Sequence, residues 1–112
     1  RNFEEKITLE EVKKKNKVIS LGGGAFMNAK IRDCVILKTK SFWLDLNIHL
    51  LEKRLTASKK RPLLFKKNIG LTLEKIYRER KDNYSLANHK IDCNNLSLNL
   101  IIKKIIKLYE NN

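Results

Sequence analysis

Cysteine and proline are scarce in these 112 residues, and no apolar run is long. The two cysteines, Cys34 and Cys93, form no C-x-x-C pair, which excludes a zinc site of paired cysteines and a disulfide framework. They predict two reduced, buried thiols in a cytoplasmic protein. A membrane-spanning helix needs about 20 apolar residues. The apolar runs are shorter, so the sequence predicts no membrane span, and it shows no signal peptide.

Acidic residues are also few: 12 of them face 25 lysines and arginines, which gives a formal net charge of +13. This excess predicts anionic partners, among them nucleotides, nucleic acid, phosphorylated metabolites and acidic membranes, without choosing between them. The lysines are spread along the chain and indicate solvated surface. The rarer arginines suit sites where a planar, bidentate donor meets a carboxylate or a phosphate.

Predicted helices and short apolar strands alternate along the chain, whose hydrophobic content of 42% suits one small globular domain. The apolar spacing predicts helices at 3–16, 28–37, 48–55, 72–88 and from 96 onward, and strands at 18–21, 41–46 and 89–93. Because parallel strands need crossover helices, this alternation predicts an α/β fold with a parallel sheet.

Local signals refine these elements. Asn47 is the predicted N-cap of the helix at 48–55. The segment 56–70 is basic and contains the one proline, Pro62, which predicts a mobile loop. The last helix carries an apolar stripe at helical spacing, which predicts core packing. The stripe consists of Leu98, Ile101, Ile102, Ile105 and Leu108.

Three glycines, Gly22 to Gly24, directly follow the predicted strand at 18–21. Open α/β sheets bind ligands at the carboxyl ends of their strands, and glycine lets backbone N–H groups approach a ligand closely. The glycines are no phosphate-binding P-loop, because no Gly-Lys-Ser/Thr follows them. His49 and His89 have no partner at metal-ligand spacing, so the sequence predicts no metal site of its own.

Four motifs in order resemble those of the shikimate kinases. They are the Arg-x-x-Glu at 1–4, the strand and glycines VISLGGGA at 18–25, the Arg-Pro-Leu-Leu at 61–64, and Glu79-Arg80 followed by Tyr84. A lone G-G-G or R-P-L-L is weak evidence, whereas the ordered set is specific. The resemblance runs from Arg1 to about Cys93.

The resemblance implies a three-layer α/β P-loop kinase of the nucleoside-monophosphate-kinase type, of which residues 1–112 form a domain incomplete at its N-terminus, with a lid at about 56–70. It implies transfer of the ATP γ-phosphoryl group to the 3-hydroxyl of shikimate, a step toward chorismate and the aromatic amino acids. It also implies Mg²⁺ as cofactor, a monomeric parent enzyme and a cytoplasmic location.

Carried over position by position, the resemblance assigns two groups of residues. Arg1 and Arg80 would bind the shikimate carboxylate, and Glu4 would hold Arg1 in place. The substrate hydroxyls would lie at Gly22, Gly23 and Gly24. On the nucleotide side, Arg61 would be the catalytic arginine that closes over the transferring phosphoryl group, and Arg54 would lie against the adenine.

The sequence also departs from this family. It contains neither the Walker A loop, whose Lys and Ser or Thr hold the phosphates and Mg²⁺, nor the family's substrate-binding Asp. The resemblance therefore implies that a Gly-x-x-Gly-x-Gly-Lys-Ser/Thr loop precedes Arg1, and that the 112 residues alone are inactive. Asp82 and Asn83 replace the Pro and Leu common before the tyrosine, and this leaves the end of that helix open.

Two other interpretations are compatible with the composition. One is another small-molecule P-loop kinase, such as a gluconate kinase, because paired arginines do not exclude a different acid. The other is a small basic nucleic-acid-binding protein, which predicts clustered Lys and Arg with exposed aromatic rings. The dispersed lysines, and the position of Phe42 and Trp43 within a strand pattern, favour the kinase.

Overall fold

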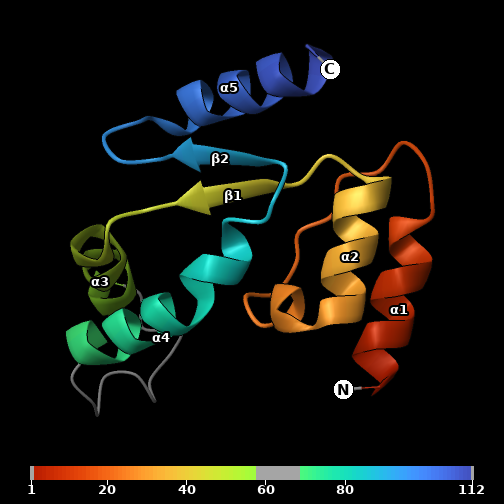
Figure 1. Cartoon of the computed structure of the whole chain (residues 1–112). Coiled ribbons are helices and arrows are strands. Elements are labelled where there is room, and N and C mark those ends of the chain that lie inside the picture. Colours follow the sequence, from red (N-terminus) through yellow and green to blue (C-terminus); the bar gives the residue numbers. More distant parts are fainter. Residues whose placement is uncertain (1, 58–68, 112) are drawn as a thin grey trace.

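The computed structural model describes residues 2–57 and 69–111, so Arg1 and most of the predicted lid lie outside the described residues. Figure 1 shows how the elements are arranged. In chain order they are α1 (Asn2–Val12), η1 (Ala25–Met27), α2 (Ala29–Lys38), β1 (Phe42–Asp45), α3 (Ile48–Ala57), α4 (Ile69–Tyr84), β2 (His89–Asp92) and α5 (Leu98–Glu110).

The two strands β1 and β2 pair in parallel, with Phe42 opposite His89 and Asp45 opposite Asp92. This confirms the predicted parallel sheet and two of its three predicted strands. Because side chains alternate along a strand, Trp43 lies on the face opposite to Phe42. Its ring contacts Tyr77 of α4, so α4 packs against that face of the sheet, while α5 lies along β2 (Figure 1).

Side-chain caps fix where three of the helices begin. Asn28 accepts hydrogen bonds from two N–H groups in the first turn of α2, at 2.9 and 3.2 Å. Asn47 accepts one from the N–H of His49 at 2.7 Å, which confirms the predicted cap of α3. Ser97 caps α5 in the same way. Such caps satisfy N–H groups that a helix leaves unpaired at its start.

The buried core lies between α1, α2 and η1. It consists of Val12, Ala25, Phe26, Ile31 and Val35. Since Ala25 and Phe26 directly follow the three glycines, their burial fixes the end of the glycine turn against the two helices. The core therefore fixes the position of the turn relative to α1 and α2.

The prediction of a buried strand at 18–21 is wrong. Val18 is fully exposed, Ile19 is partly exposed, and the sheet of the described residues contains β1 and β2 but not this segment. An extended apolar segment becomes a strand only where a neighbouring strand supplies its hydrogen-bond partners. No described strand lies beside these residues, so 18–20 stay exposed, while Leu21 is half-buried against the core.

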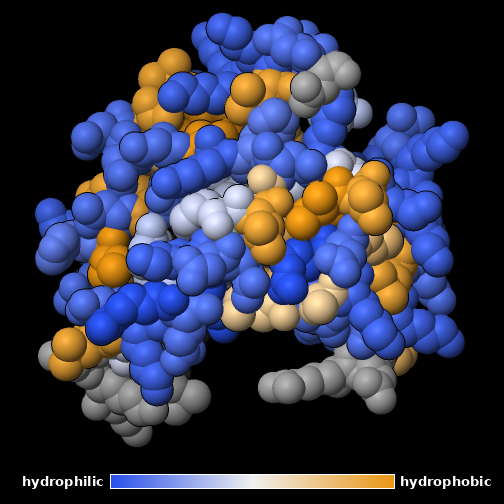
Figure 2. All heavy atoms as spheres, in the orientation of Figure 1, coloured by the Kyte–Doolittle hydropathy of each residue, from blue (hydrophilic) through white to orange (hydrophobic). Residues whose placement is uncertain are grey.

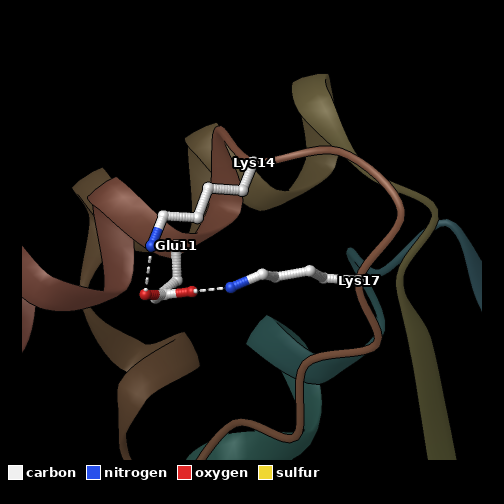
Figure 3. Close-up of polar contacts among 3 residues, drawn as sticks. All are labelled: Glu11, Lys14 and Lys17. Carbon is white, nitrogen blue, oxygen red and sulfur yellow. Dashed lines mark hydrogen bonds and ion pairs between the residues drawn. The ribbon is translucent and has the colours of Figure 1, made fainter.

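The first helix ends at Val12 instead of at the predicted residue 16, and a charged turn follows it. The carboxylate of Glu11 accepts hydrogen bonds from the ammonium groups of Lys14, at 2.8 Å, and Lys17, at 3.1 Å (Figure 3). These bonds lower the pKa of Glu11 below its ordinary value. Any stability that they add is therefore present above that ordinary value and is lost as the pH falls through the lowered one.

The fourth helix runs from Ile69 to Tyr84, instead of from Thr72 to about Asn88 as predicted. It ends early because Asn88 takes part in the start of the sheet. The side-chain oxygen of Asn88 accepts hydrogen bonds from the N–H and the hydroxyl of Ser41, at 2.9 and 2.7 Å. Asn88 therefore joins the beginnings of β1 and β2.

The prediction that the apolar stripe of α5 is core is also wrong. None of its side chains is buried. Ile101, Ile105 and Leu108 are half-buried, whereas Leu98 is 71% exposed and Ile102 is 44% exposed. In the described structure α5 packs against β2, and part of the stripe stays on the surface, where Figure 2 shows apolar patches over this region.

The two cysteines are free, and Cys93 is buried while Cys34 is half-buried, which confirms the prediction of reduced thiols but only partly that of their burial. Within residues 2–57 and 69–111, none of the helices combines the length and apolar character that crossing a bilayer requires.

Candidate functional site

The guanidinium of Arg80 lies directly against the glycine turn. A methyl group at Gly23 would come within 2.7 Å of Arg80 Nη1, and one at Gly24 would lie 3.8 Å from Arg80 Nη2. A separation below 3 Å is a clash, so the arginine lies where it does because Gly23 has no side chain. The structure thus brings together three of the predicted substrate residues, Gly23, Gly24 and Arg80.

Tyr84 holds the turn from the same helix. Its hydroxyl donates a hydrogen bond of 2.5 Å to the carbonyl oxygen of Gly23. Arg80 and Tyr84 are four residues apart in α4, so their side chains lie on the same side of the helix. The four-residue spacing is a sequence signal for a shared role with Arg80, but the sequence does not show that the hydroxyl of Tyr84 meets the oxygen of Gly23.

Aromatic rings support Tyr84 on two sides. Its ring centre lies 6.3 Å from that of Phe26, which follows the glycine turn, and 5.9 Å from that of Trp43 on β1. Both pairs are tilted, which is a favourable arrangement for aromatic rings at these distances. Trp43, which the sequence places within a strand pattern, packs against rings of α4, and the ring of Tyr84 is fixed between the turn and the sheet.

The backbone N–H groups of the glycine turn are unpaired donors. Among the residues that the structure describes, no acceptor meets the N–H groups of Gly22, Gly23 and Gly24, although the carbonyl oxygens of Gly22 and Gly24 accept bonds from Ala25 and Met27. All three glycines are exposed. Consecutive free N–H groups next to a guanidinium are suited to binding an anion and its neighbouring hydroxyl groups.

Two of the four described arginines are bonded to other groups of the protein, and Arg80 is not one of them. Arg32 donates to the carbonyl oxygens that follow the glycine turn. Arg78 forms an ion pair with Glu74 at 3.3 Å on the exposed side of α4. Arg80 and Arg54 have no acidic partner in the described part of the chain. These two are therefore available to bind an external anion.

The first turn of α1 carries the predicted Glu4. Glu4 is exposed, and it meets no partner among the described residues, while Arg1 lies outside them. The neighbouring Glu5 accepts a hydrogen bond of 3.3 Å from Asn28 and lies 3.7 Å from the ammonium group of Lys30. This turn of α1 therefore lies beside the start of α2, a few residues beyond the glycines.

The predicted nucleotide residues are separate from this cluster. Arg54 is exposed on α3, and no described contact joins it to the glycine turn; Arg61 lies outside the described residues. Burial raises the pKa of the Cys93 thiol, and the positive charge of Arg54 acts against this rise.

A hollow of about 360 Å³ opens at the carboxyl ends of the two strands. It is lined by Asp45, Leu46, Asn47, Ile48, His49, Tyr77 and Asn94, none of which was a predicted site residue. No group of three His, Cys, Asp or Glu side chains that suits a metal ion occurs in the described residues.

Replacing Gly23 by alanine tests the contact between the turn and Arg80. The new methyl group would displace the guanidinium, so we expect affinity for a carboxylate ligand to fall by about tenfold, the effect of weakening one charge-assisted hydrogen bond. Gly22→Ala is the matched control, because nothing lies within 4 Å of the methyl group there, and it should have a smaller effect. Equal losses in both variants would contradict the close approach. Calorimetric titration measures the ligand affinity of both variants.

Comparison with known proteins identifies relatives of one kind. Residues 1–110 match the family described as shikimate kinase. The shikimate kinase of Bartonella quintana (strain Toulouse) is 32% identical over 111 residues, which cover 99% of this chain and 53% of that protein. The shikimate kinase of Zymomonas mobilis subsp. mobilis is 32% identical over 87 residues, or 78% of this chain and 49% of that protein.

A third relative, the shikimate kinase of Bartonella henselae, is 29% identical over 96% of this chain and 51% of its own length. The chain spans about half the length of these curated relatives. No solved structure matches it significantly.

Proposed function

The chain belongs to the shikimate kinase family, and on this premise we propose that its protein transfers the γ-phosphoryl group of ATP to the 3-hydroxyl of shikimate. The observation that carries the proposal is the guanidinium of Arg80, which has no acidic partner among the described residues and lies against a glycine turn with free N–H groups. Shikimate presents a carboxylate and ring hydroxyls, and this cluster offers donors for both.

In this proposal the carboxylate of shikimate binds between Arg80 and Arg1, with Glu4 holding Arg1. A planar guanidinium can donate two parallel hydrogen bonds to a carboxylate, which fixes the direction of the acid as well as its position. The N–H groups of Gly22, Gly23 and Gly24 then bind hydroxyl groups. Fixing the acceptor hydroxyl in this way is a large part of catalysis in phosphoryl transfer.

The proposed nucleotide residues come from the motifs that resemble those of the shikimate kinases. We propose that Arg54 lies against the adenine and that Arg61 stabilises the charge on the transferring phosphoryl group, whose bond to ADP breaks as the bond to the shikimate oxygen forms. Arg54 is exposed and has no acidic partner among the described residues, which suits contact with a nucleotide. Among the described residues, no three His, Cys, Asp or Glu side chains come together in a way that could hold Mg²⁺.

The full sheet architecture is also part of the proposal. We propose the three-layer parallel sheet of the P-loop kinases, with residues 1–112 as the part that carries the substrate site and the lid. Two observations support it: the extended apolar residues 18–21 have no described neighbouring strand, and the apolar stripe of α5 is only half covered. A wider sheet would cover both surfaces and remove the energetic cost of exposing them.

A nucleic-acid-binding function has less support. Trp43 and Tyr84 pack against each other and against neighbouring rings, so they are not free platforms on which bases could stack. No described observation favours gluconate over shikimate either.

The test is an assay of ADP formation by the product of the complete reading frame, with shikimate, gluconate and no acceptor as the three arms. We expect ADP formation that depends on shikimate and yields shikimate 3-phosphate. Turnover with gluconate but not with shikimate would show that gluconate is the acceptor in place of shikimate. If neither acid supports turnover and the protein binds generic DNA in a salt-sensitive way, the nucleic-acid interpretation is favoured.

A further inference from the structure

We infer that Tyr84 is a positioning residue that fixes the glycine turn in its ligand-binding conformation. The inference rests on the proposed function, in which this turn binds the acid, and it adds a role for a residue that does not itself touch the substrate. It is carried by the bond from the Tyr84 hydroxyl to the Gly23 carbonyl and by the rings on either side of Tyr84.

The turn needs such an anchor because glycine restrains its backbone less than any other residue does. The carbonyl oxygens of Gly22 and Gly24 are held locally, by N–H groups of Ala25 and Met27 at 3.0 and 3.1 Å. The carbonyl oxygen of Gly23 has no such local partner in the described part of the chain. It is held by Tyr84, a residue 61 positions away on α4.

Holding this carbonyl also sets the direction of a donor. In a planar trans peptide the C=O of one residue and the N–H of the next point in opposite directions. The bond from Tyr84 to the Gly23 oxygen therefore directs the N–H of Gly24 away from Tyr84. That N–H has no acceptor among the described residues, so it remains available to a ligand.

The position of the tyrosine hydroxyl is itself restrained. The ring of Tyr84 lies between Phe26 and Trp43, and Phe26 belongs to η1, immediately after the turn. Arg80 precedes Tyr84 by one helical turn on the same side of α4, so both residues move with that helix. One helix thus sets the guanidinium and the peptide donors in a fixed relation to each other.

The test is Tyr84→Phe in the product of the complete reading frame, with shikimate as the titrant in a calorimetric binding experiment. The substitution keeps the ring and removes the hydroxyl. We expect the Kd for shikimate to rise about fivefold to tenfold, as expected for the loss of one hydrogen bond that preorganises the site. The KM for ATP should stay unchanged, and so should the thermal unfolding midpoint within a few degrees.

Tyr77→Phe is the matched control. Tyr77 lies on the same helix and its ring also contacts Trp43, at 6.4 Å, but its hydroxyl has no hydrogen-bond partner among the described residues. We expect this variant to bind shikimate as tightly as the unsubstituted protein. Hydrogen exchange supplies a second readout at the two amides that are bonded to the turn, those of Ala25 and Met27. These amides should exchange faster in Tyr84→Phe than in Tyr77→Phe, with the rest of the protein unaltered.

The outcomes separate the inference from the function on which it rests. An unsubstituted protein that binds no shikimate overturns the proposed function and this inference with it. If the unsubstituted protein binds shikimate and Tyr84→Phe binds it equally well, with unchanged exchange at Ala25 and Met27, the inference alone is overturned. A Tyr84→Phe variant that only unfolds at a lower temperature, without a change in Kd, assigns Tyr84 to stability and also overturns it.

Discussion

Replacing Arg80 by alanine is expected to weaken shikimate binding by about 10²- to 10³-fold, the effect of losing two charge-assisted hydrogen bonds to one carboxylate. The loss should appear in the Kd for shikimate and in kcat/KM, with the KM for ATP unchanged. Arg80 is the residue for this test because its guanidinium lies 2.7 Å from a methyl group placed at Gly23 and has no acidic partner among the described residues. Calorimetric titration and steady-state kinetics measure the two quantities.

Arg78→Ala is the control for this prediction. Arg78 lies on the same helix, carries the same charge and is paired with Glu74 at the surface, with 66% of its side chain exposed. Exposed ion pairs contribute little to stability and none to a remote site, so this variant should keep the unsubstituted constants. The prediction fails if the two variants behave alike, because a general loss of positive charge would then explain both.

Replacing Arg61 by alanine is expected to lower kcat by about 10³-fold, the lower range observed for arginines that stabilise a transferring phosphoryl group. Affinity for shikimate should stay the same, because the proposal assigns Arg61 to the nucleotide and Arg80 to shikimate. Arg61 lies outside the described residues, so this variant tests the proposed role directly. Single-turnover kinetics with ATP and shikimate separate the chemical step from binding.

Lys60→Ala is the neighbouring control, since it removes one positive charge from the same segment. We expect at most a severalfold rise in the KM for ATP and an unchanged kcat. A kcat for Arg61→Ala within threefold of the unsubstituted value would remove Arg61 from the catalytic step. A comparable fall in Lys60→Ala would assign the effect to the charge of the whole segment.

The elements that the sequence predicted well depend on local signals. Asn47 caps α3 as predicted, and the strands β1 and β2 lie within their predicted ranges. A cap needs residues two or three positions away, and an apolar strand pattern needs only its own alternation. Such information is contained in a short window of sequence, so it can be found without the fold.

Two of the failed predictions concern the burial of apolar segments, which depends on neighbouring elements. Residues 18–21 and the stripe of α5 are apolar, and both were predicted to be buried, yet Val18 and Leu98 are largely exposed in the described structure. An apolar pattern shows which side chains a fold would bury, but a second surface has to be present to cover them. The pattern alone cannot show whether that surface lies within these residues.

In the candidate site, too, some features follow from local sequence and others depend on the fold. Arg80 and the glycines were found through motifs, and the structure brings Arg80 against Gly23 and Gly24. The bond from Tyr84 to Gly23 joins residues 61 positions apart. Helical spacing places Tyr84 beside Arg80, but only the packing of α4 against the turn shows which backbone oxygen its hydroxyl meets.

The most direct test of the account is a crystal structure of the product of the complete reading frame with shikimate bound. The account predicts that the shikimate carboxylate accepts hydrogen bonds from the guanidinium of Arg80 and that ring hydroxyls lie against the N–H groups of Gly22 to Gly24. Shikimate bound elsewhere, with Arg80 paired to a protein carboxylate, would contradict it.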